Sequence, residues 1–240
     1  MKYKSISVFF PAFNEQENIK KCILSAKKYL ARHFKDYEII VVASGSTDKT
    51  AEIVKALAAR DGHIKLVNQN ILGYGAALRS GFSSSSKELI FYTDSDNQFN
   101  IEEMDKLFPL LKSHDVVSGY RINRKDPISR IIVADVYNLL IRSLFNLKVR
   151  DIDASFKIFK RKVLKSMKLK SRTGLIDAEV LIKARNRGFS IGQIGVTHYA
   201  RTQGQTRYAI GKRNDFFAIV KPKVVIDILK EIKTLWRDLK

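Results

Sequence analysis

The stretch Leu89-Ile-Phe-Tyr-Thr-Asp-Ser-Asp96 joins five residues that favour a buried strand to two carboxylates one residue apart. Its apolar, aromatic and β-branched part predicts a strand over 89–93. Asp94 and Asp96 follow at once, and both can turn toward one hard cation that bridges the phosphates of a bound nucleotide. The alternative is an Asp- and Ser-rich turn without a ligand, because these residues are common where strands end.

Strands and helices alternate on either side of this stretch. Strands are expected at 6–10, where Pro11 ends the strand, and at 37–42, 64–67 and 89–93. Helices are expected after Asn14, which would be an N-cap with Glu17 three residues on, after 45–48 and after Gly73-Tyr-Gly75. This alternation predicts an α/β fold, Rossmann-like, with a mixed and mostly parallel sheet that carries helices on both faces.

Ligands of such sheets bind beyond the carboxyl ends of the strands. Three segments follow expected strands directly, at 11–15, 43–48 and 94–98. We therefore expect these three segments to meet at one edge of the sheet and to form the binding site.

The second half of the chain is less regular. The expected elements are a helix at 101–112, a strand at 116–119, a helix at 127–145, a strand at 155–159, a helix at 176–187, an extended segment at 189–198, a polar loop at 202–212 and a helix from Asp215 onward. We expect one domain over residues 1–213 and an amphipathic helical tail over residues 214–240.

The charge balance is strongly basic, with 44 Lys and Arg against 24 Asp and Glu and a net charge of +20. Such an excess favours anionic partners, namely nucleotides, phosphates, nucleic acid or an acidic membrane surface, although a solvated lysine-rich surface would give the same count. Cys22 is the single cysteine, so no internal disulfide is expected. No apolar run is long enough to span a membrane, and no secretory signal follows the basic Met1–Ser7, so a cytoplasmic protein is expected.

An ordered set of short motifs carries a family resemblance over roughly residues 5 to 210. The motifs are Ser7–Glu15, Glu38–Thr50, Leu72–Leu78, Asp94–Phe99, Gly119-Tyr-Arg121, Asp151–Lys157, Ala178-Glu179 and Arg201-Thr-Gln-Gly204. Together they resemble the family 2 glycosyltransferases, which have the GT-A fold. The closer resemblance is to polyprenyl-phosphate sugar transferases, such as dolichyl-phosphate mannosyltransferase and bacterial undecaprenyl-phosphate glycosyltransferases.

The resemblance implies an inverting transfer of a sugar from a nucleotide-sugar, GDP-mannose or a UDP-sugar, to a polyprenyl-phosphate lipid. Mg²⁺ or Mn²⁺ would be held by Asp94 and Asp96, with Gln98 close by. The residues expected at the nucleotide or its phosphates are Pro11, Phe13, Glu15, Ser44, Ser95, Gln98, Arg121 and Arg201. Asp153 and Glu179 are expected on the acceptor side, where a carboxylate could act as a base, although both could instead form salt bridges with nearby arginines.

One departure from the family pattern concerns the nucleotide base. Relatives usually carry one or two acidic residues after the second strand, where this chain has Ala43 and Ser44. A serine can bond a base edge but has no charge and less reach, so the resemblance does not indicate which base is bound. Arg201, Arg207 and Lys212 lie in a polar loop that resembles the family's mobile acceptor loop.

The C-terminal segment predicts how the protein would reach a lipid acceptor. Its apolar residues recur at helical spacing: Val225, Ile228, Leu229, Ile232, Leu235, Trp236 and Leu239. With the flanking basic residues, this pattern is typical of a helix that lies in the headgroup region of a membrane. We expect peripheral attachment to the cytoplasmic face, or delivery of the acceptor by an integral membrane partner. The same stripe could instead pack against the domain or a second subunit.

Three other functions remain possible on the sequence alone. A glycosyltransferase of cell-surface polysaccharide synthesis would use a hydroxyl acceptor. A nucleic-acid-binding protein would explain the positive charge, but it would not explain two aspartates at the end of a buried strand. A sugar-nucleotide pyrophosphorylase would need a Gly-rich, Arg-containing loop where this chain has Pro11-Ala-Phe-Asn-Glu15.

Overall fold

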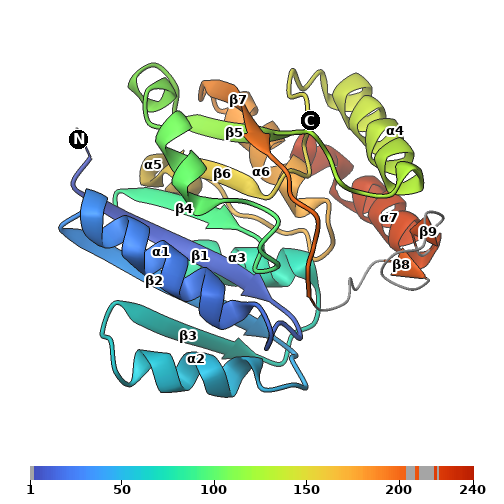
Figure 1. Cartoon of the computed structure of the whole chain (residues 1–240). Coiled ribbons are helices and arrows are strands. Elements are labelled where there is room, and N and C mark those ends of the chain that lie inside the picture. Colours follow the sequence, from blue (N-terminus) through green and yellow to red (C-terminus); the bar gives the residue numbers. More distant parts are fainter. Residues whose placement is uncertain (1–2, 204–208, 211–218, 221) are drawn as a thin grey trace.

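A seven-stranded sheet forms the centre of the protein in the computed structural model, which describes residues 3–203, 209–210, 219–220 and 222–240. The strand order is β3-β2-β1-β4-β6-β5-β7 (Figure 1). The strands are β1 (Ser5–Ala12), β2 (Asp36–Ser44), β3 (Ile64–Gln69), β4 (Leu89–Thr93), β5 (Val116–Ile122), β6 (Phe156–Lys160) and β7 (Ile191–Thr197). Within this sheet only β6 runs antiparallel to its neighbours. The expected mixed, mostly parallel α/β sheet is confirmed.

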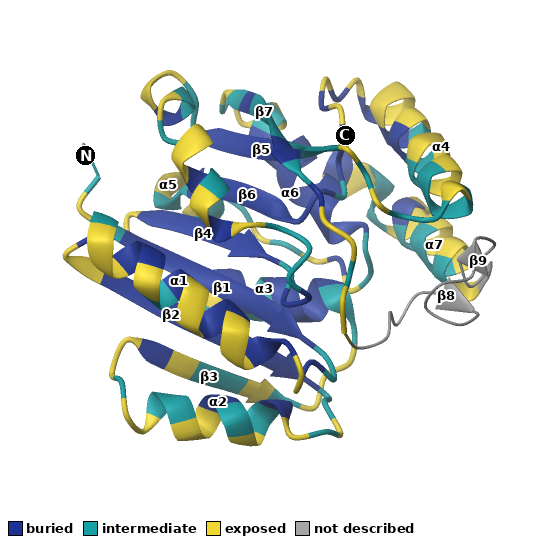
Figure 2. Cartoon of the chain, viewed as in Figure 1, coloured by how far each residue is buried: buried dark blue, intermediate teal, exposed yellow. Residues whose placement is uncertain are grey.

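Helices cover both faces of the sheet, and successive residues of each central strand point to opposite layers. On β1, Ile6, Val8 and Phe10 pack in one core with α1 (Ile19–His33) and α2 (Thr50–Ala58). Phe9 packs in the other core, which contains residues of α3 (Tyr74–Ser84), α4 (Ile128–Phe145), α5 (Arg161–Lys165), α6 (Ile176–Asn186) and α7 (Pro222–Leu239). The strands between these layers are mostly buried (Figure 2).

The first βα connection differs from the expectation. The strand does not end at Pro11, because β1 stays paired with β2 up to Ala12. Asn14 is not an N-cap, since α1 begins at Ile19. Asn14 instead adopts a positive φ of 55°, and its Oδ1 accepts a hydrogen bond from the Thr47 backbone at 2.8 Å. Asn14 therefore joins the loop that follows β1 to the loop that follows β2.

Two helix expectations in the second half also need correction. Residues 101–112 form two short 3₁₀ helices, η1 (Ile101–Lys106) and η2 (Leu110–Lys112), rather than one α-helix. Pro109 lies between them and has no N–H for a continuous ladder. The short helix α5 follows β6 directly and was not expected.

The helix expected from Asp215 begins later. Ile219–Val220 form β9, which pairs antiparallel with β8 (Ala209–Ile210), and the helix α7 starts at Pro222. The expected loop at 202–212 therefore contains a strand. Its other residues from 204 to 212, including Arg207 and Lys212, lie outside the described residues.

One end of α7 packs against the domain. Ile232 and Leu239 are buried in the core, and the Trp236 ring lies 5.3 Å from that of Phe145. The other end keeps Val225 and Leu229 more than 40% exposed. The apolar stripe of the tail is thus divided between contact with the domain and exposure to solvent.

Glu231 anchors α7 to the segment that precedes α6. Its carboxylate accepts hydrogen bonds from the Ser171 hydroxyl at 2.5 Å, the Thr173 hydroxyl at 2.5 Å and the Arg172 backbone at 2.8 Å. The same segment packs tightly on α3, where a Cβ at Gly75 would come within 2.6 Å of the Thr173 carbonyl oxygen. Glu231 therefore connects α7 to the N-terminal end of α3.

We predict that Glu231→Ala lowers the free energy of unfolding by about 2 kcal/mol, because several donors lose a charged acceptor at once. Urea denaturation measures the loss. Asp227→Ala removes a carboxylate from the same helix and should cost less than about 0.5 kcal/mol. Equal losses in the two variants would contradict the anchoring role.

Candidate active site

A cleft of about 570 Å³ opens at the carboxyl ends of β1, β2 and β4. The loops expected to meet at this edge contribute Pro11, Phe13 and Glu15 from one side and Ser44 from another. The segment after β4 contributes Asp94, Ser95, Asp96 and Gln98. The parallel arrangement of these strands is what brings the three loops together.

Asp94 and Asp96 lie at the wall of this cleft with few groups to offset their charge. Burial, and next the neighbouring charge of Asp96, raise the pKa of Asp94 to about 7. Burial also raises the pKa of Asp96, against the opposing effect of Arg201. Asp94 accepts a hydrogen bond from the Tyr74 hydroxyl at 3.3 Å, and Asp96 accepts one from the Gln98 backbone at 3.1 Å. Loss of hydration and mutual repulsion make this pair a place where a cation would be stabilised.

The donor set fits Mg²⁺ or Mn²⁺. Both prefer carboxylate and other oxygen ligands, and magnesium is usually held by one or two carboxylates together with substrate phosphates. In the described part of the chain, no group of three or more His, Cys, Asp or Glu side chains could hold a metal ion. Asp94 and Asp96 would thus need further oxygen ligands, which nucleotide phosphates or the amide oxygen of Gln98 could supply.

Among the described residues, Arg201 is the cation that forms an ion pair with Asp96. Its guanidinium lies 2.5 Å from the Glu15 carboxylate and 3.4 Å from Asp96. The Gln98 side chain donates to the Tyr199 carbonyl at 3.0 Å, which ties the segment before Arg201 to the loop after β4. Burial raises the pKa of Glu15, and Arg201 opposes this rise. Arg201 therefore connects two of the expected nucleotide-binding loops.

A second set of acidic groups lies deeper in the cleft. Asp177 forms a fully buried ion pair with Lys157 at 2.8 Å. The pKa of Asp153 is raised to about 7, first by burial and next by the charge of Asp177. Among the described residues, Asp153 Oδ1 and the Tyr137 hydroxyl are buried without a hydrogen-bond partner. Unpaired buried polar atoms at a cleft wall are costly unless water or a ligand supplies the missing hydrogen bond.

Arginines form the opposite wall. Arg121 makes a bidentate contact with Asp151, at 2.8 and 2.7 Å. Asp126 lies 2.9 Å from Arg124, 3.4 Å from Arg130 and 3.7 Å from Arg121. Three guanidinium groups thus share two carboxylates, and one positive charge remains in excess. The Arg121 guanidinium is held in place by Asp151, so Arg124 and Arg130 are the more adaptable cations of this wall.

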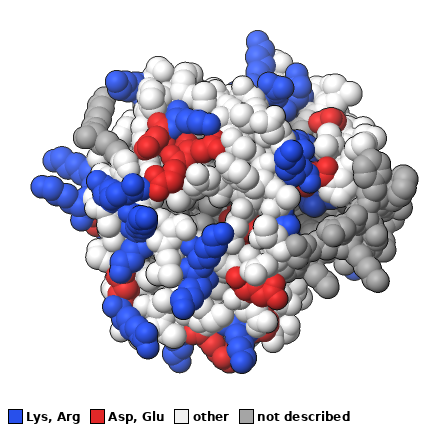
Figure 3. Space-filling model, viewed as in Figure 1, with Lys and Arg blue, Asp and Glu red and all other residues white. Residues whose placement is uncertain are grey.

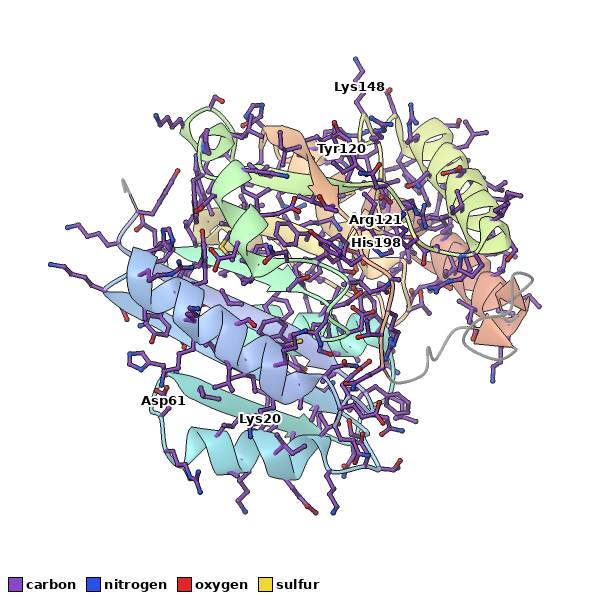
Figure 4. The ribbon with its side chains drawn as sticks, in the orientation of Figure 1. Lys20, Asp61, Tyr120, Arg121, Lys148 and His198 are labelled. Carbon is purple, nitrogen blue, oxygen red and sulfur yellow. The ribbon has the colours of Figure 1, made fainter. Side chains whose placement is uncertain are left out.

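His198 lies beside this arginine wall, and Figure 4 shows it next to Arg121. Burial is the main reason that the pKa of His198 falls to about 4. The imidazole is therefore neutral at pH 7 and adds no charge to the cleft.

The outer part of the cleft is apolar and lies between α4 and α7. Its walls include Ile132 and Val136 from α4 and Val225, Ile228 and Leu229 from α7. Ile132 is 57% and Val136 is 62% exposed. A polar inner end and an apolar outer end thus belong to one continuous cleft.

The structure separates Glu179 from the other expected site residues. Glu179 does not line the cleft and is fully buried. Its carboxylate accepts hydrogen bonds from the backbone of Lys170 at 2.8 Å and Ser171 at 2.7 Å, and pairs with Lys183 at 2.7 Å. This carboxylate holds the segment before α6 and is not among the residues that line the cleft.

Two serines near the nucleotide end have structural hydrogen bonds. Ser44 donates to the Ile71 carbonyl at 2.5 Å, and Ser95 donates to the Pro11 carbonyl at 2.8 Å. Ala43 is fully buried and does not line the cleft. The two positions that depart from the family pattern therefore offer no exposed acid to a base.

Several lining residues were not expected from the sequence. Asp126, Arg130 and the apolar face of α4 carry no motif, whereas Tyr74 and Ser155 lie inside the motifs Leu72–Leu78 and Asp151–Lys157 without being expected at the site. Tyr74 could have been noticed inside Gly73-Tyr-Gly75, but its contact with Asp94 depends on how α3 meets β4. The helix at 128–145 was expected, yet its spacing of apolar residues equals that of an ordinary buried face.

Comparison with known proteins gives a consistent picture. A family model described as "Glycosyl transferase family 2" matches residues 7–168. Undecaprenyl-phosphate 4-deoxy-4-formamido-L-arabinose transferases from Salmonella choleraesuis (strain SC-B67) and Salmonella newport (strain SL254) are 32% identical to this chain over 211 residues, which are 86% of this chain. The chain spans 63% of the length of these relatives.

Solved structures show the same fold. Glucosyl-3-phosphoglycerate synthase from Mycobacterium tuberculosis, in complex with Mn²⁺, UDP and phosphoglyceric acid, aligns with a TM-score of 0.66 and 23% identity. The alignment covers 84% of this chain and 72% of that one. A second structure of the same synthase, with Mg²⁺ and UDP, aligns with a TM-score of 0.65 and 22% identity over 84% of this chain and 73% of that one. The expected GT-A fold class is confirmed.

We predict that Asp153→Asn stabilises the protein in a pH-dependent way. The folded pKa of about 7 exceeds the ordinary value near 4, so the stability that this group contributes is full below about pH 4 and is lost as pH rises through 7. The stabilisation by Asp153→Asn should grow by about 2.5 kcal/mol between pH 5 and pH 8.

Urea unfolding at the two pH values, without divalent metal, measures this difference. Asp135→Asn on the exposed side of α4 is the matched control and should show no such growth. A constant difference between Asp153→Asn and the wild type would contradict the raised pKa.

Proposed function

The chain belongs to glycosyl transferase family 2, and we propose that it transfers a sugar from a nucleotide-sugar to the phosphate of a polyprenyl lipid, with inversion at the anomeric carbon. One observation carries the proposal. A single cleft has an aspartate pair at one end, an arginine wall in the middle and an apolar exit between two helices. A nucleotide diphosphate, an acceptor phosphate and a lipid chain need these three environments in this order.

The donor would occupy the end near β1, β2 and β4. Asp94 and Asp96, with Gln98, would hold Mg²⁺ or Mn²⁺ there, and the bound metal would neutralise the charge of the departing diphosphate. Pro11, Phe13 and Glu15 line the same end, so they would position the nucleoside. The mycobacterial synthase of the same fold binds Mn²⁺ or Mg²⁺ together with UDP, which supports this assignment. GDP-mannose and UDP-sugars both remain possible donors, since Ala43 and Ser44 present no acid to select a base.

The acceptor phosphate would lie against the arginines. An oxygen of this phosphate would attack the anomeric carbon while the bond from that carbon to the diphosphate breaks, and the diphosphate leaves with the bonding electrons. A phosphate ester is already ionised near pH 7, so this attack needs no base. Arg124, Arg130 and Arg201 would orient the phosphate, because a guanidinium matches phosphate oxygens with two parallel hydrogen bonds. The Salmonella relatives are named as undecaprenyl-phosphate transferases, which supports a lipid phosphate as acceptor.

A hydroxyl acceptor, as in cell-surface polysaccharide synthesis, is the second candidate. The observation in its favour is Asp153, whose buried oxygen has no partner among the described residues and whose pKa of about 7 suits a general base. The apolar exit favours the lipid, because a polar polysaccharide would not cover the exposed apolar side chains of Ile132 and Val136.

Nucleic acid is a poor fit as a partner. On the face seen in Figure 3, basic side chains are interspersed with acidic ones instead of forming one uninterrupted stripe. Nucleic-acid-binding surfaces concentrate their positive charge along the path of the phosphate backbone. The net charge of +20 fits phosphate-bearing substrates and an anionic membrane surface better than it fits nucleic acid.

A lipid acceptor requires a route to the membrane. None of the described helices is long and apolar enough to cross a bilayer. The exposed apolar side chains of α4 and α7 could instead dip into the surface around the exit of the cleft: Ile128, Ile132, Val136, Leu139, Val225, Ile226 and Leu229. Peripheral attachment to the cytoplasmic face, where nucleotide-sugars are present, is therefore part of the proposal.

The reaction is tested by incubating the protein with a panel of radiolabelled nucleotide-sugars and polyprenyl phosphate and then extracting the lipid. Asp96→Asn should lose at least about 100-fold in transfer rate and should weaken Mn²⁺ binding measured by electron paramagnetic resonance. Excess EDTA should abolish the wild-type activity. Glu52→Gln on α2 is the control and should retain full activity and Mn²⁺ affinity. Full activity in excess EDTA would exclude the metal role, and transfer to a sugar hydroxyl alone would favour the second candidate.

Membrane attachment is tested by flotation with vesicles that contain phosphatidylglycerol. Leu139 and Ile226 are 65% and 48% exposed and lie outside the cleft lining, so Leu139→Ser/Ile226→Ser should weaken binding about tenfold at low salt. Leu24→Ser on α1 removes a side chain that is 45% exposed and should have no effect. If the wild type ignores these vesicles, the attachment proposal fails and an integral membrane partner must deliver the acceptor.

A further inference from the structure

A second cavity, of about 710 Å³, lies between α3 and the segment that starts with α5. Its apolar floor includes Phe82 and Ile90, and Met167 and Leu169 lie on the side of α5. It shares no lining residue with the catalytic cleft. Its volume falls within the range of small-molecule sites.

The polar lining of this cavity is entirely cationic or neutral. Four cations line it: Arg79, Arg161, Lys165 and Lys168. Four serines, at 80 and 83–85, add hydroxyl groups, and none of the lining residues is acidic. The nearby carboxylate of Asp115 pairs with Lys160 and Lys162, so it does not offset these charges.

Arg79, which lines the cavity, has a guanidinium N–H without a hydrogen-bond acceptor in the described part of the chain. Its Nη1 donates to the Lys170 carbonyl at 3.3 Å. Its Nε is buried and has no hydrogen-bond partner among the described residues. A charged donor that loses water without gaining an acceptor is destabilising, and four cations around one cavity repel each other. An anion in the cavity would relieve the repulsion among the four cations that line it.

We propose that this cavity binds a phosphate-bearing small molecule. Two guanidinium and two ammonium groups match the several oxygens and the multiple charge of a phosphate better than a single carboxylate. Serine hydroxyls can donate to the remaining oxygens, and the apolar floor can cover an organic part of the ligand. The site is independent of the proposed transfer reaction, because its residues neither line nor contact the catalytic cleft residues Asp94 and Asp96.

Inorganic pyrophosphate, titrated calorimetrically in the presence of EDTA, is the probe. Arg79→Gln/Arg161→Gln should bind it at least tenfold more weakly than the wild type. Arg60→Gln/Lys148→Gln removes two exposed cations elsewhere and so carries the same net charge. This control should bind as the wild type does. Thermal unfolding checks that each variant is folded, and pyrophosphate should raise the melting temperature of the cavity variant less than that of the control.

Two further arms locate the site and identify the source of the phosphate. In an Arg201→Ala background, which removes a cation of the catalytic cleft, the cavity variant should still bind pyrophosphate at least tenfold more weakly than its control. Flotation with phosphatidylglycerol vesicles compares the cavity variant with its control: an equal result assigns the cavity to a soluble phosphate compound, and weaker binding by the cavity variant assigns it to a lipid headgroup. Unchanged pyrophosphate affinity in the cavity variant, or equal affinities of the cavity variant and its control in the Arg201→Ala background, would overturn the proposal.

Discussion

The gathering of negative charge in one cleft is the constraint on which the rest of the site depends. Asp94, Asp96, Asp153 and Asp177 all line it, and each would lose hydration there. Among the described residues, only Asp177 of these four has a fully buried cation, Lys157, against it. The raised pKa values of Asp94 and Asp153, both about 7, are the consequence. A fold that tolerates such a site must obtain its stability elsewhere, and the two continuous cores on either side of the sheet supply it.

Much of this arrangement could be predicted because it follows from local patterns. The strand at 89–93 and its two aspartates depend on residue type and on a chain direction that parallel sheets impose, so the meeting of the loops after β1, β2 and β4 was foreseeable. The predictions that were wrong are those in which a second local interaction competes with the expected one. Asn14 has the residue type of an N-cap, but Thr47 offers its side chain a partner from the neighbouring loop. Pro109 divides a segment whose apolar spacing is typical of one helix.

Roles that depend on where a side chain points could not be predicted. Glu179 and Asp153 both belong to motifs of the family, yet one turns toward the backbone of Lys170 and Ser171 and the other into the cleft. Arg121 likewise belongs to a motif, but its Nε and Nη2 both donate hydrogen bonds to the Asp151 carboxylate. The partners of Glu179 and Arg121 lie eight to thirty residues away along the chain, and no periodicity in the sequence records such a contact.

The apolar face of α4 is the clearest example of information that only the fold contains. The spacing of its apolar residues is typical of a stripe that faces the core: Ile128, Ile132, Val136 and Leu139. The buried residues of this helix are instead Asn138, Ile141 and Phe145. The helix projects beyond the edge of the sheet, and α7 lines the other side of the same exit. Large exposed apolar patches on one face are costly unless something apolar covers them. The same cleft is lined by Arg130 and by this apolar patch, so the polyprenyl phosphate of the proposed reaction would present a charged head to the one and an apolar chain to the other.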